Sequence, residues 1–436
     1  MGVVFPGALQ GCQALASTLA AARGLPSSPG ESSSLLLPHF PGAVGALLSA
    51  GERIPTSDEG LSLQMAAFAA VRAAVVAAPD DCCPLLANLA AVLNQQARDT
   101  GRRIVLLASR AVSRAQAAYL RRLRELQAFL CSVLQEIFAR VGQQGLDLRP
   151  RLPPCEDVMQ TVESALENNA SVAAAEAVRL CGALVGLWGS QFCPYVPTLW
   201  RAGYRAASNA SAAEDCDAAL QVFHDICASP NAPILQPYRD ILLDLVLQHL
   251  AAGATAPRTR ASCIVLMADL ATLYPAGADA EIMPKCMPAL AAATAICASV
   301  IGTPSCTLDG EEAWALQRAI MLTHTSIFQG WSKPLVWSHL HSGADKGGPA
   351  AHLRGLVRLM EGAFAGRQPP GQRPEALALL VTLLTTLADC VDAMGPAFER
   401  DGWHNALLME CAGCPELAAH VQAAQQVIFK AVHKME

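Results

Sequence analysis

The sequence predicts an all-α protein, a right-handed α-solenoid superhelix in which helix pairs are stacked in series. Ala and Leu dominate a chain that is 53% hydrophobic and 16% charged, as is typical of closely packed helices. Runs with the two-residue alternation of β-strands are scarce. One stretch of the chain also repeats its own pattern, with two helical segments in each copy.

The repeated stretch covers residues 192–275. Each copy has a helical segment that contains a Pro-Tyr pair, a polar gap and a second helical segment. Pro194 and Pro237 of the two Pro-Tyr pairs lie 43 residues apart, and Asp225 and Asp269 of the second segments lie 44 apart. A period of about 40–47 residues with two helices is typical of HEAT and armadillo repeats. We therefore expect one solenoid of about ten such pairs over the whole 436-residue chain.

Pro, Gly and polar loops separate the expected helices of the first third of the chain. These helices are expected near residues 8–22, 42–52, 60–78 and 84–97. The last two are expected to pair with each other across the turn that contains Pro79. Residues 103–141 keep helical periodicity almost continuously, with Leu120, Leu123 and Leu126 at helical spacing. They predict one unusually long helix or two abutting helices.

Helix pairs return after the Pro-rich break at residues 149–154. The expected elements are 155–167 with 172–188, the two repeat copies, 282–301 with 311–329, and finally 374–394, 403–410 and 415–434. The segment 331–374 is expected to be irregular, and it ends in a loop rich in Gly and Pro. Most of the other gaps are short, which favours antiparallel packing of consecutive helices.

The net charge of −6 is unevenly distributed. Eight arginines gather in one segment, where Asp99 is the only acid: Arg98, Arg102, Arg103, Arg110, Arg114, Arg121, Arg122 and Arg124. Removing these nine residues from the totals of 31 basic and 37 acidic residues leaves 23 against 36, a net charge of −13. The acidic remainder disfavours nucleic acid and suits a basic protein partner. The Arg-rich segment 98–124 could contact phosphate, but a solvated helix face is the favoured interpretation.

The cysteines and the apolar runs argue against a disulfide-rich secreted protein and against a membrane-inserted protein. Sixteen cysteines are scattered over helical stretches without the density of a disulfide framework, which favours a reducing compartment. The N-terminus lacks the cationic start of a signal peptide. The most apolar run, residues 286–302, is 17 residues long and contains Pro288, so we expect a buried helix and no membrane insertion.

Catalytic and metal-binding motifs have no support in the sequence. A P-loop and a nucleophile elbow are both missing. His404, Cys411, Cys414 and His420 are four possible zinc ligands, but their spacing matches no common structural zinc site. We expect neither an enzyme nor a cofactor nor a metal site.

Three aspartates define the predicted partner-binding surface. Asp225 and Asp269 occupy equivalent places on second helices, and Asp389 repeats the pattern in the sequence Leu-Ala-Asp-Cys. The second helix of each pair usually lines the concave face of a right-handed solenoid, so these acids would form a ladder there. The alternative is that they serve solubility or cap a neighbouring loop. A ladder of carboxylates would attract a basic helical segment of a partner.

Long parts of the chain resemble a known family. Residues 192–275 strongly resemble the C-terminal half of importin-β, the nuclear import receptor. Residues 63–96, with the turn Asp-Cys-Cys-Pro, and residues 126–142 and 379–398 resemble other helices of the same half. The order and spacing of these segments identify the family better than any one of them.

The resemblance implies a superhelix of HEAT repeats whose C-terminal half wraps the basic importin-β-binding domain of importin-α. It also implies a site for the Phe-Gly repeats of nucleoporins, expected in hydrophobic crevices between first helices. The resemblance implies that the family's N-terminal half, which carries the principal Ran-GTP site, is not covered by these residues, and Val427 stands at about the position of a family Trp. Ran-GTP binding is therefore expected to be weak or lost.

The expected function is that of a nuclear transport receptor, or its adaptor-binding half, in the cytoplasm, the nucleus and the nuclear pore. Its expected partners are an importin-α-like adaptor or a basic cargo protein, and Phe-Gly nucleoporins. The alternative is a HEAT-repeat scaffold, such as a phosphatase scaffold subunit, without a transport role.

Overall fold

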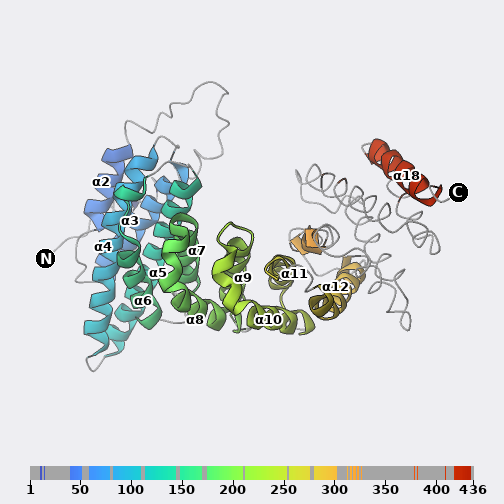
Figure 1. Cartoon of the computed structure of the whole chain (residues 1–436). Coiled ribbons are helices and arrows are strands. Elements are labelled where there is room, and N and C mark those ends of the chain that lie inside the picture. The colour runs from blue at the N-terminus through green and yellow to red at the C-terminus, as the bar shows by residue number, and fades with distance from the viewer. Residues whose placement is uncertain are drawn as a thin grey trace, which may run out of the picture. The chain divides into compact units, whose positions relative to one another are not determined.

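The structure is a computed structural model in which two compact units follow each other along the chain (Figure 1). It describes residues 40–51, 58–78, 82–109, 113–143, 148–168, 174–209, 212–252, 255–274, 279–301 and 417–433, and isolated residues elsewhere. The units are Met1–Ile234 and Leu235–Glu436. All regular elements among the described residues are helical, which confirms the all-α prediction. The predicted irregular segment at 331–374 lies outside the described residues.

The first unit consists of two helix layers (Figure 1). Its helices are α2 (Phe40–Gly51), α3 (Asp58–Ala77), α4 (Cys83–Ala108), α5 (Arg114–Gln143), α6 (Cys155–Asn168), α7 (Ala174–Trp188), α8 (Val196–Ala207) and α9 (Ala213–Cys227). Four consecutive pairs form: α2 with α3, α4 with α5, α6 with α7, and α8 with α9. The second helices α3, α5, α7 and α9 also pack against one another in order, as expected for a solenoid.

The pairing in the first third of the chain differs from the sequence-based prediction. Helix α3 packs against α2 and α5, so residues 60–78 and 84–97 belong to successive pairs and do not form one pair. Of the two alternatives predicted for residues 103–141, the structure shows two helices and not one long helix, because α4 ends at Ala108 and α5 begins at Arg114. A capping box starts the second helix: the Gln116 amide donates to Ser113 Oγ at 3.3 Å, and the Ser113 amide donates to Gln116 Oε1 at 2.9 Å.

The repeat period predicted from the sequence is confirmed. Helices α8 and α10 (Arg239–Ala251) begin 43 residues apart, and α9 and α11 (Pro257–Thr272) begin 44 residues apart. Each first helix also follows a short 3-10 helix that contains the proline of the Pro-Tyr pair, η3 (Gly189–Tyr195) and η4 (Ala232–Tyr238). In these two pairs the proline therefore lies directly before the first helix.

The core is formed by aliphatic and phenylalanine side chains. Phe68, Phe138 and Phe223 are among the largest fully buried side chains, on the second helices α3, α5 and α9. Helix α3 holds an apolar window, Gly60–Ala77, that is long enough to cross a membrane, but half of it is buried inside the unit. Its fully buried residues include Leu61 and Phe68, which is the pattern of a core helix.

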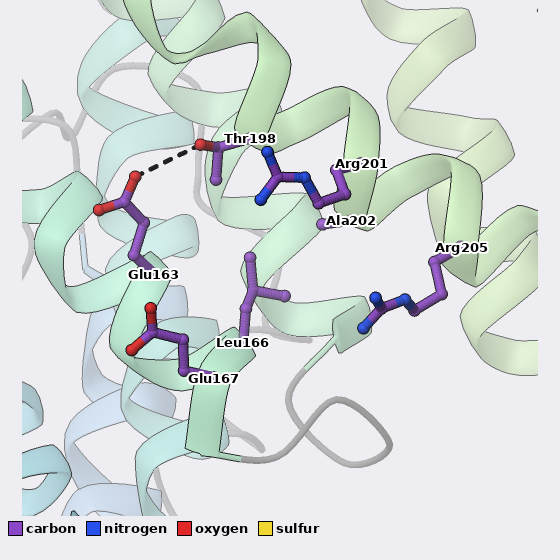
Figure 2. Close-up of a pocket in the computed structure, with 7 residues that line it drawn as sticks. All are labelled: Glu163, Leu166, Glu167, Thr198, Arg201, Ala202 and Arg205. Carbon is purple, nitrogen blue, oxygen red and sulfur yellow. Dashed lines mark hydrogen bonds between the residues drawn. The ribbon is translucent and has the colours of Figure 1, made fainter.

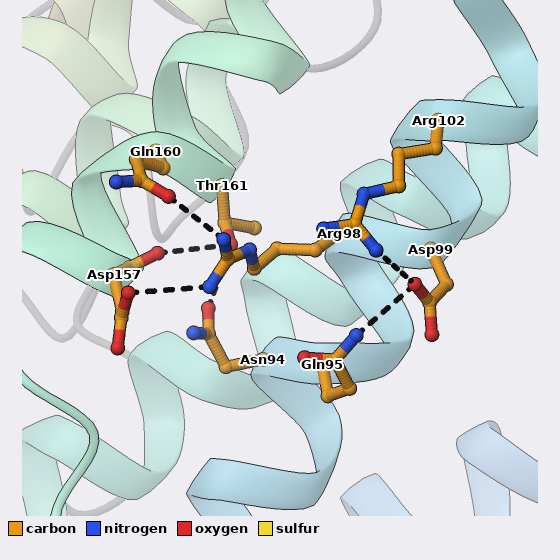
Figure 3. Close-up of polar contacts among 8 residues, drawn as sticks. All are labelled: Asn94, Gln95, Arg98, Asp99, Arg102, Asp157, Gln160 and Thr161. Atoms are coloured by element: carbon orange, nitrogen blue, oxygen red, sulfur yellow. Dashed lines mark hydrogen bonds and ion pairs between the residues drawn. The ribbon is translucent and has the colours of Figure 1, made fainter.

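Polar side chains fix the register of the first helices α4 and α6 (Figure 3). Thr161 Oγ1 donates to Asn94 Oδ1 at 2.7 Å, and both side chains are buried. At the edge of this contact, Arg98 pairs with Asp157 at 3.2 Å and donates to Gln160 Oε1 at 2.8 Å. A shift of one residue along either helix would separate these partners.

A close approach of three helices occurs at Gly101. A Cβ atom at this position would lie 2.4 Å from Ser164 Oγ on α6 and 2.7 Å from Gln127 Nε2 on α5. Any larger residue would push these helices away from α4. Glycine at this position therefore allows the tight packing of α4, α5 and α6.

The second unit contains α10, α11, α12 (Asp279–Ile301) and, near its end, α18 (Ala418–His433). Helix α10 packs against α11 and α12. The end of α11 is tied to the start of α10, because the Tyr274 hydroxyl donates to Asp240 at 2.6 Å and the Arg239 guanidinium lies 4.3 Å from the Tyr274 ring centroid. Burial, followed by the hydrogen bond to Asp240, raises the pKa of the Tyr274 phenol.

Candidate partner-binding surfaces

Helix α9 carries the most acidic surface among the second helices of the first unit. Its charged residues are Glu214, Asp215, Asp217 and Asp225, and it contains no Lys or Arg. Glu214 and Asp215 lie in the first turn, where carboxylates interact favourably with the helix macrodipole. Burial, opposed by the nearby Arg179, raises the pKa of the Asp215 carboxyl. Such a helix presents carboxylates without competing cations of its own.

The three predicted ladder residues have different surroundings. Asp225 is exposed near the end of α9 and accepts a hydrogen bond from Gln221 Nε2 at 2.9 Å. Asp269 is half-buried on α11, between the buried Ala268 and Leu270. Asp389 lies outside the described residues. Since Asp225 and Asp269 belong to different units, a shared ladder stays a prediction.

Helix α5 has the opposite charge from α9. Its two acids, Glu125 and Glu136, are outnumbered by Arg114, Arg121, Arg122, Arg124 and Arg140. Some of these arginines hold the layer together: Arg140 donates to the carbonyl oxygens at the end of α3, and Arg122 donates to Ser62 Oγ at 3.3 Å. The second-helix layer of the first unit is thus basic on α5 and acidic on α9.

A cavity of about 390 Å³ lies between the first helices α6 and α8 (Figure 2). Its lining consists of Glu163, Leu166 and Glu167 from α6 and Thr198, Arg201, Ala202 and Arg205 from α8. The Thr198 hydroxyl donates to Glu163 Oε1 at 3.3 Å. Figure 2 shows the carboxylates on one wall and the guanidinium groups on the other, with Leu166 between them.

The lining of this cavity differs from the hydrophobic crevices expected between adjacent first helices. Five of the seven lining residues are charged or polar, and only Leu166 and Ala202 are apolar. A ligand could pack one apolar side chain against these two residues while its polar groups contact the charged walls of the cavity. The sequence does contain a signal for this site. Two like-charged pairs at i, i+4 spacing, Glu163 with Glu167 and Arg201 with Arg205, face one another across the cavity.

Possible metal ligands do not gather in the part of the chain that the structure describes, where no group of three or more His, Cys, Asp or Glu side chains could hold a metal ion. Of the four zinc candidates, only His420 is described, and it is exposed on α18. The ten cysteines that the structure describes in full form no disulfide, and Cys193 is the exposed one among them.

Comparison with known proteins places this fold in context. The family described as importin subunit beta-1-like, TPR repeats, matches residues 9–324. Among curated proteins, none matches the chain by sequence. A crystal structure of importin beta is similar to this chain with a TM-score of 0.68 and 19% identity, over 98% of this chain and 46% of that one.

Two complexes of Kap95, which is yeast importin-beta, are also similar. The Kap95:Nup1 complex gives a TM-score of 0.60 and 16% identity, over 98% of this chain and 47% of that one. The structure in which Kap95p binding induces the switch loops of RanGDP to adopt the GTP-bound conformation gives 0.59 and 15%, over 98% and 48%. The chain thus spans about half the length of these proteins. Their common fold confirms the predicted α-solenoid.

Proposed function

Because the chain belongs to the importin subunit beta-1-like family, we propose that it acts as a nuclear transport receptor, or the adaptor-binding half of one. Its ligand would be the basic importin-β-binding helix of an importin-α-like adaptor, or a basic segment of a cargo protein. The proposal includes work in both cytoplasm and nucleus, with contacts at the nuclear pore.

The observation that carries this proposal is the charge of α9. Four acids and no Lys or Arg lie on this second helix, and Asp225 is exposed at its end. Acidic surfaces of this kind attract Lys- and Arg-rich helices and lose affinity as salt rises. Asp269 on α11 and Asp389 would extend the surface along the chain, as the repeat period of the sequence suggests.

A second contact in the proposal is with Phe-Gly nucleoporins, between the first helices α6 and α8. The support is the cavity there, whose apolar floor of Leu166 and Ala202 offers room for one phenylalanine ring. Arg201, on the wall beside Ala202, would add a cation–π contact to the ring. The proposal also includes weak or absent Ran-GTP binding, supported by the resemblance of this chain to the half of the family without the principal Ran site.

Retention of two peptides tests the proposal against the scaffold alternative. The chain is immobilised and offered a basic importin-β-binding peptide and a Phe-Gly peptide, with a Ser-Gly peptide as the control. The receptor hypothesis expects retention of the basic peptide, weakened by salt, and retention of Phe-Gly above Ser-Gly. A scaffold without a transport role retains neither.

The two surfaces are separated by one variant each. Asp225→Lys should lower retention of the basic peptide and leave retention of the Phe-Gly peptide unchanged. Leu166→Ser should lower retention of the Phe-Gly peptide and leave retention of the basic peptide unchanged. Glu156→Lys on α6 and Ile241→Ser on α10 are the matched controls, because both positions are exposed and lie outside the two surfaces. If each test variant lowers retention of both peptides equally, the assignment of separate surfaces is wrong.

A further inference from the structure

The end of α4 and the start of α5 extend past the described parts of the helices beside them. Helix α6 ends at Asn168, whose amide lies 3.5 Å from the carbonyl oxygen of Gly101 on α4. Helix α3 begins shortly before Ser62, which accepts a hydrogen bond from Arg122 on α5. The hairpin tip is residues 102–109 at the end of α4 and residues 113–121 at the start of α5, drawn in turquoise in Figure 1.

The lengths of the helices explain this projection. Helices α4 and α5 have 26 and 30 residues, while the following pair, α6 and α7, has 14 and 15. At a rise of about 1.5 Å per residue, the longer pair has several turns without a neighbour among the described residues of the next pair. Residues 113–118 are all exposed as a result.

Two adjacent aliphatic side chains stand in water on the hairpin tip. Val105 is 57% exposed and Leu106 is 62% exposed. Single exposed aliphatic residues are normal, but this pair lies beside Arg102, which is three and four positions away on the same helix face. On α5, the exposed Ala117 and Ala118 add a small, smooth surface next to Arg121. The tip therefore combines apolar area with cations.

All charged side chains of the hairpin tip are cations. They are Arg102, Arg103, Arg114 and Arg121. Two of them pair with acids just outside the tip, Arg102 with Asp99 at 3.0 Å and Arg121 with Glu125 at 3.1 Å. Arg103 and Arg114 form no ion pair within the described parts of the chain. The tip thus keeps an excess of positive charge.

Local hydrogen bonds order each of the two described helix ends of the hairpin tip. The capping box of Ser113 and Gln116 fixes the start of α5, and the Ser109 amide donates to the Val105 carbonyl at 3.1 Å at the end of α4. An ordered surface loses little conformational entropy when a ligand binds. Each of the two helix ends therefore presents its exposed side chains on an ordered backbone.

We propose that the hairpin tip binds an acidic segment of a partner protein that also presents an aliphatic side chain. Arginine guanidinium groups pair with carboxylates through two parallel hydrogen bonds, which suits Arg103 and Arg114 to Asp and Glu side chains. The aliphatic side chain of the partner would cover Val105 and Leu106. This partner has the opposite charge from the basic ligand of α9, so the inference goes beyond the proposed function.

The surface fits two other classes of macromolecule less well. Single-stranded nucleic acid is bound by stacking on aromatic side chains, and Tyr119 is the one aromatic residue of the hairpin tip. Binding at a membrane surface needs a long apolar helix face, whereas the tip exposes two large aliphatic side chains. A carboxylate-rich protein segment matches both its charge and its small apolar area.

A fluorescence anisotropy titration tests this proposal on the full chain. The probe is a labelled peptide rich in Asp and Glu that contains two leucines, and a second peptide has serines in place of the leucines. One variant combines Val105→Ser with Leu106→Ser, and the other combines Arg103→Glu with Arg114→Glu. Since these side chains are exposed or half-buried, circular dichroism should show the same helix content in all variants.

The proposal expects each double variant to bind the leucine-containing peptide about tenfold more weakly than the original chain. The variant that combines Arg103→Glu with Arg114→Glu should also make the affinity depend less on salt concentration. Arg149→Glu with Arg151→Glu, at exposed positions outside the hairpin tip and the cavity, and Ile241→Ser on α10 are matched controls and should leave the affinity unchanged. Equal affinity of the original chain and both double variants would overturn the proposal. Binding of RNA or anionic vesicles, lost in the same variants while the peptide fails to bind, would also overturn it.

Discussion

Thr161 donates its hydroxyl hydrogen to the Oδ1 atom of Asn94 across 2.7 Å, in the buried interface between α4 and α6. These two residues are 67 positions apart in the sequence, and their hydrogen bond joins two consecutive first helices. Neither side chain can exchange its partner for water without opening the interface. The packing of these two consecutive repeats therefore depends on one buried hydrogen bond.

Thr161→Val should destabilise the first unit by about 1–3 kcal/mol, because the methyl group keeps the shape but leaves the buried Asn94 oxygen without its donor. Urea unfolding followed by circular dichroism measures this change. Thr198→Val is the matched control, since Thr198 donates to the exposed Glu163 at the cavity. Equal unfolding midpoints for the two variants would show that the buried hydrogen bond contributes no more to stability than the exposed one.

Gly203→Ala should destabilise α8 by about 1–3 kcal/mol, because a Cβ atom there would lie 2.6 Å from Phe223 Cζ in the core. Gly186→Ala on α7 is the opposite case. Gly186 is exposed, no atom lies within 4 Å of its added Cβ, and alanine favours the helix by up to about 1 kcal/mol. Thermal unfolding of the two variants should shift in opposite directions, and a shift in the same direction would contradict this packing.

Arg140→Met should destabilise the contact between α3 and α5 by about 1.5–3 kcal/mol, because it keeps the aliphatic stem but removes the charged donors from the carbonyl groups at the end of α3. The matched control is Arg121→Met, whose exposed i, i+4 ion pair with Glu125 is worth about 0.3–0.5 kcal/mol. Chemical unfolding curves of both variants measure the difference. A loss as small as that of the control would mean that the carbonyl groups are satisfied without Arg140.

Stability should fall as the solution becomes alkaline, because burial raises the pKa of the Cys131 thiol to about 12 and that of Cys216 to about 11. In the unfolded chain these thiols lose their protons near pH 9, so the stabilising effect is full below that pH and is lost as pH rises toward the folded pKa. Each group then contributes a slope of about 1.4 kcal/mol per pH unit.

Urea unfolding at several pH values between about 8 and 10 measures this slope. Cys131→Ala should make the slope shallower, while Cys193→Ala, at an exposed position, should leave it unchanged. An unchanged slope in Cys131→Ala would show that this thiol does not titrate with unfolding.

The sequence predicted the repeat far better than the pairing of helices outside it. The 43-residue spacing of Pro194 and Pro237 located α8 to α11, because each proline lies in a 3-10 helix directly before the first helix of its pair. Hydrophobic periodicity could not locate the break between α4 and α5, since apolar spacing continues through it. The capping pair Ser113 and Gln116 was the available signal for this break.

The candidate surfaces were only partly predictable. Asp225 was chosen for its repeat position, and it is exposed on an acidic helix. Asp269 has the same repeat position but is half-buried, because neighbouring helices decide exposure and the period does not. The cavity between α6 and α8 needs the stacking of two first helices, so its residues could be listed as charged pairs but not placed together from the sequence.

The central claim is that carboxylates on second helices hold a positively charged helix of a partner. Titration of a labelled basic helical peptide into the original chain, and into a variant that combines Asp225→Lys, Asp269→Lys and Asp389→Lys, tests it most directly. The claim predicts an affinity that falls with salt and is about tenfold lower in the triple variant. Glu156→Lys with Asp244→Lys, on the first helices α6 and α10, should leave the affinity unchanged. The same affinity in the triple variant as in the original chain would contradict the claim.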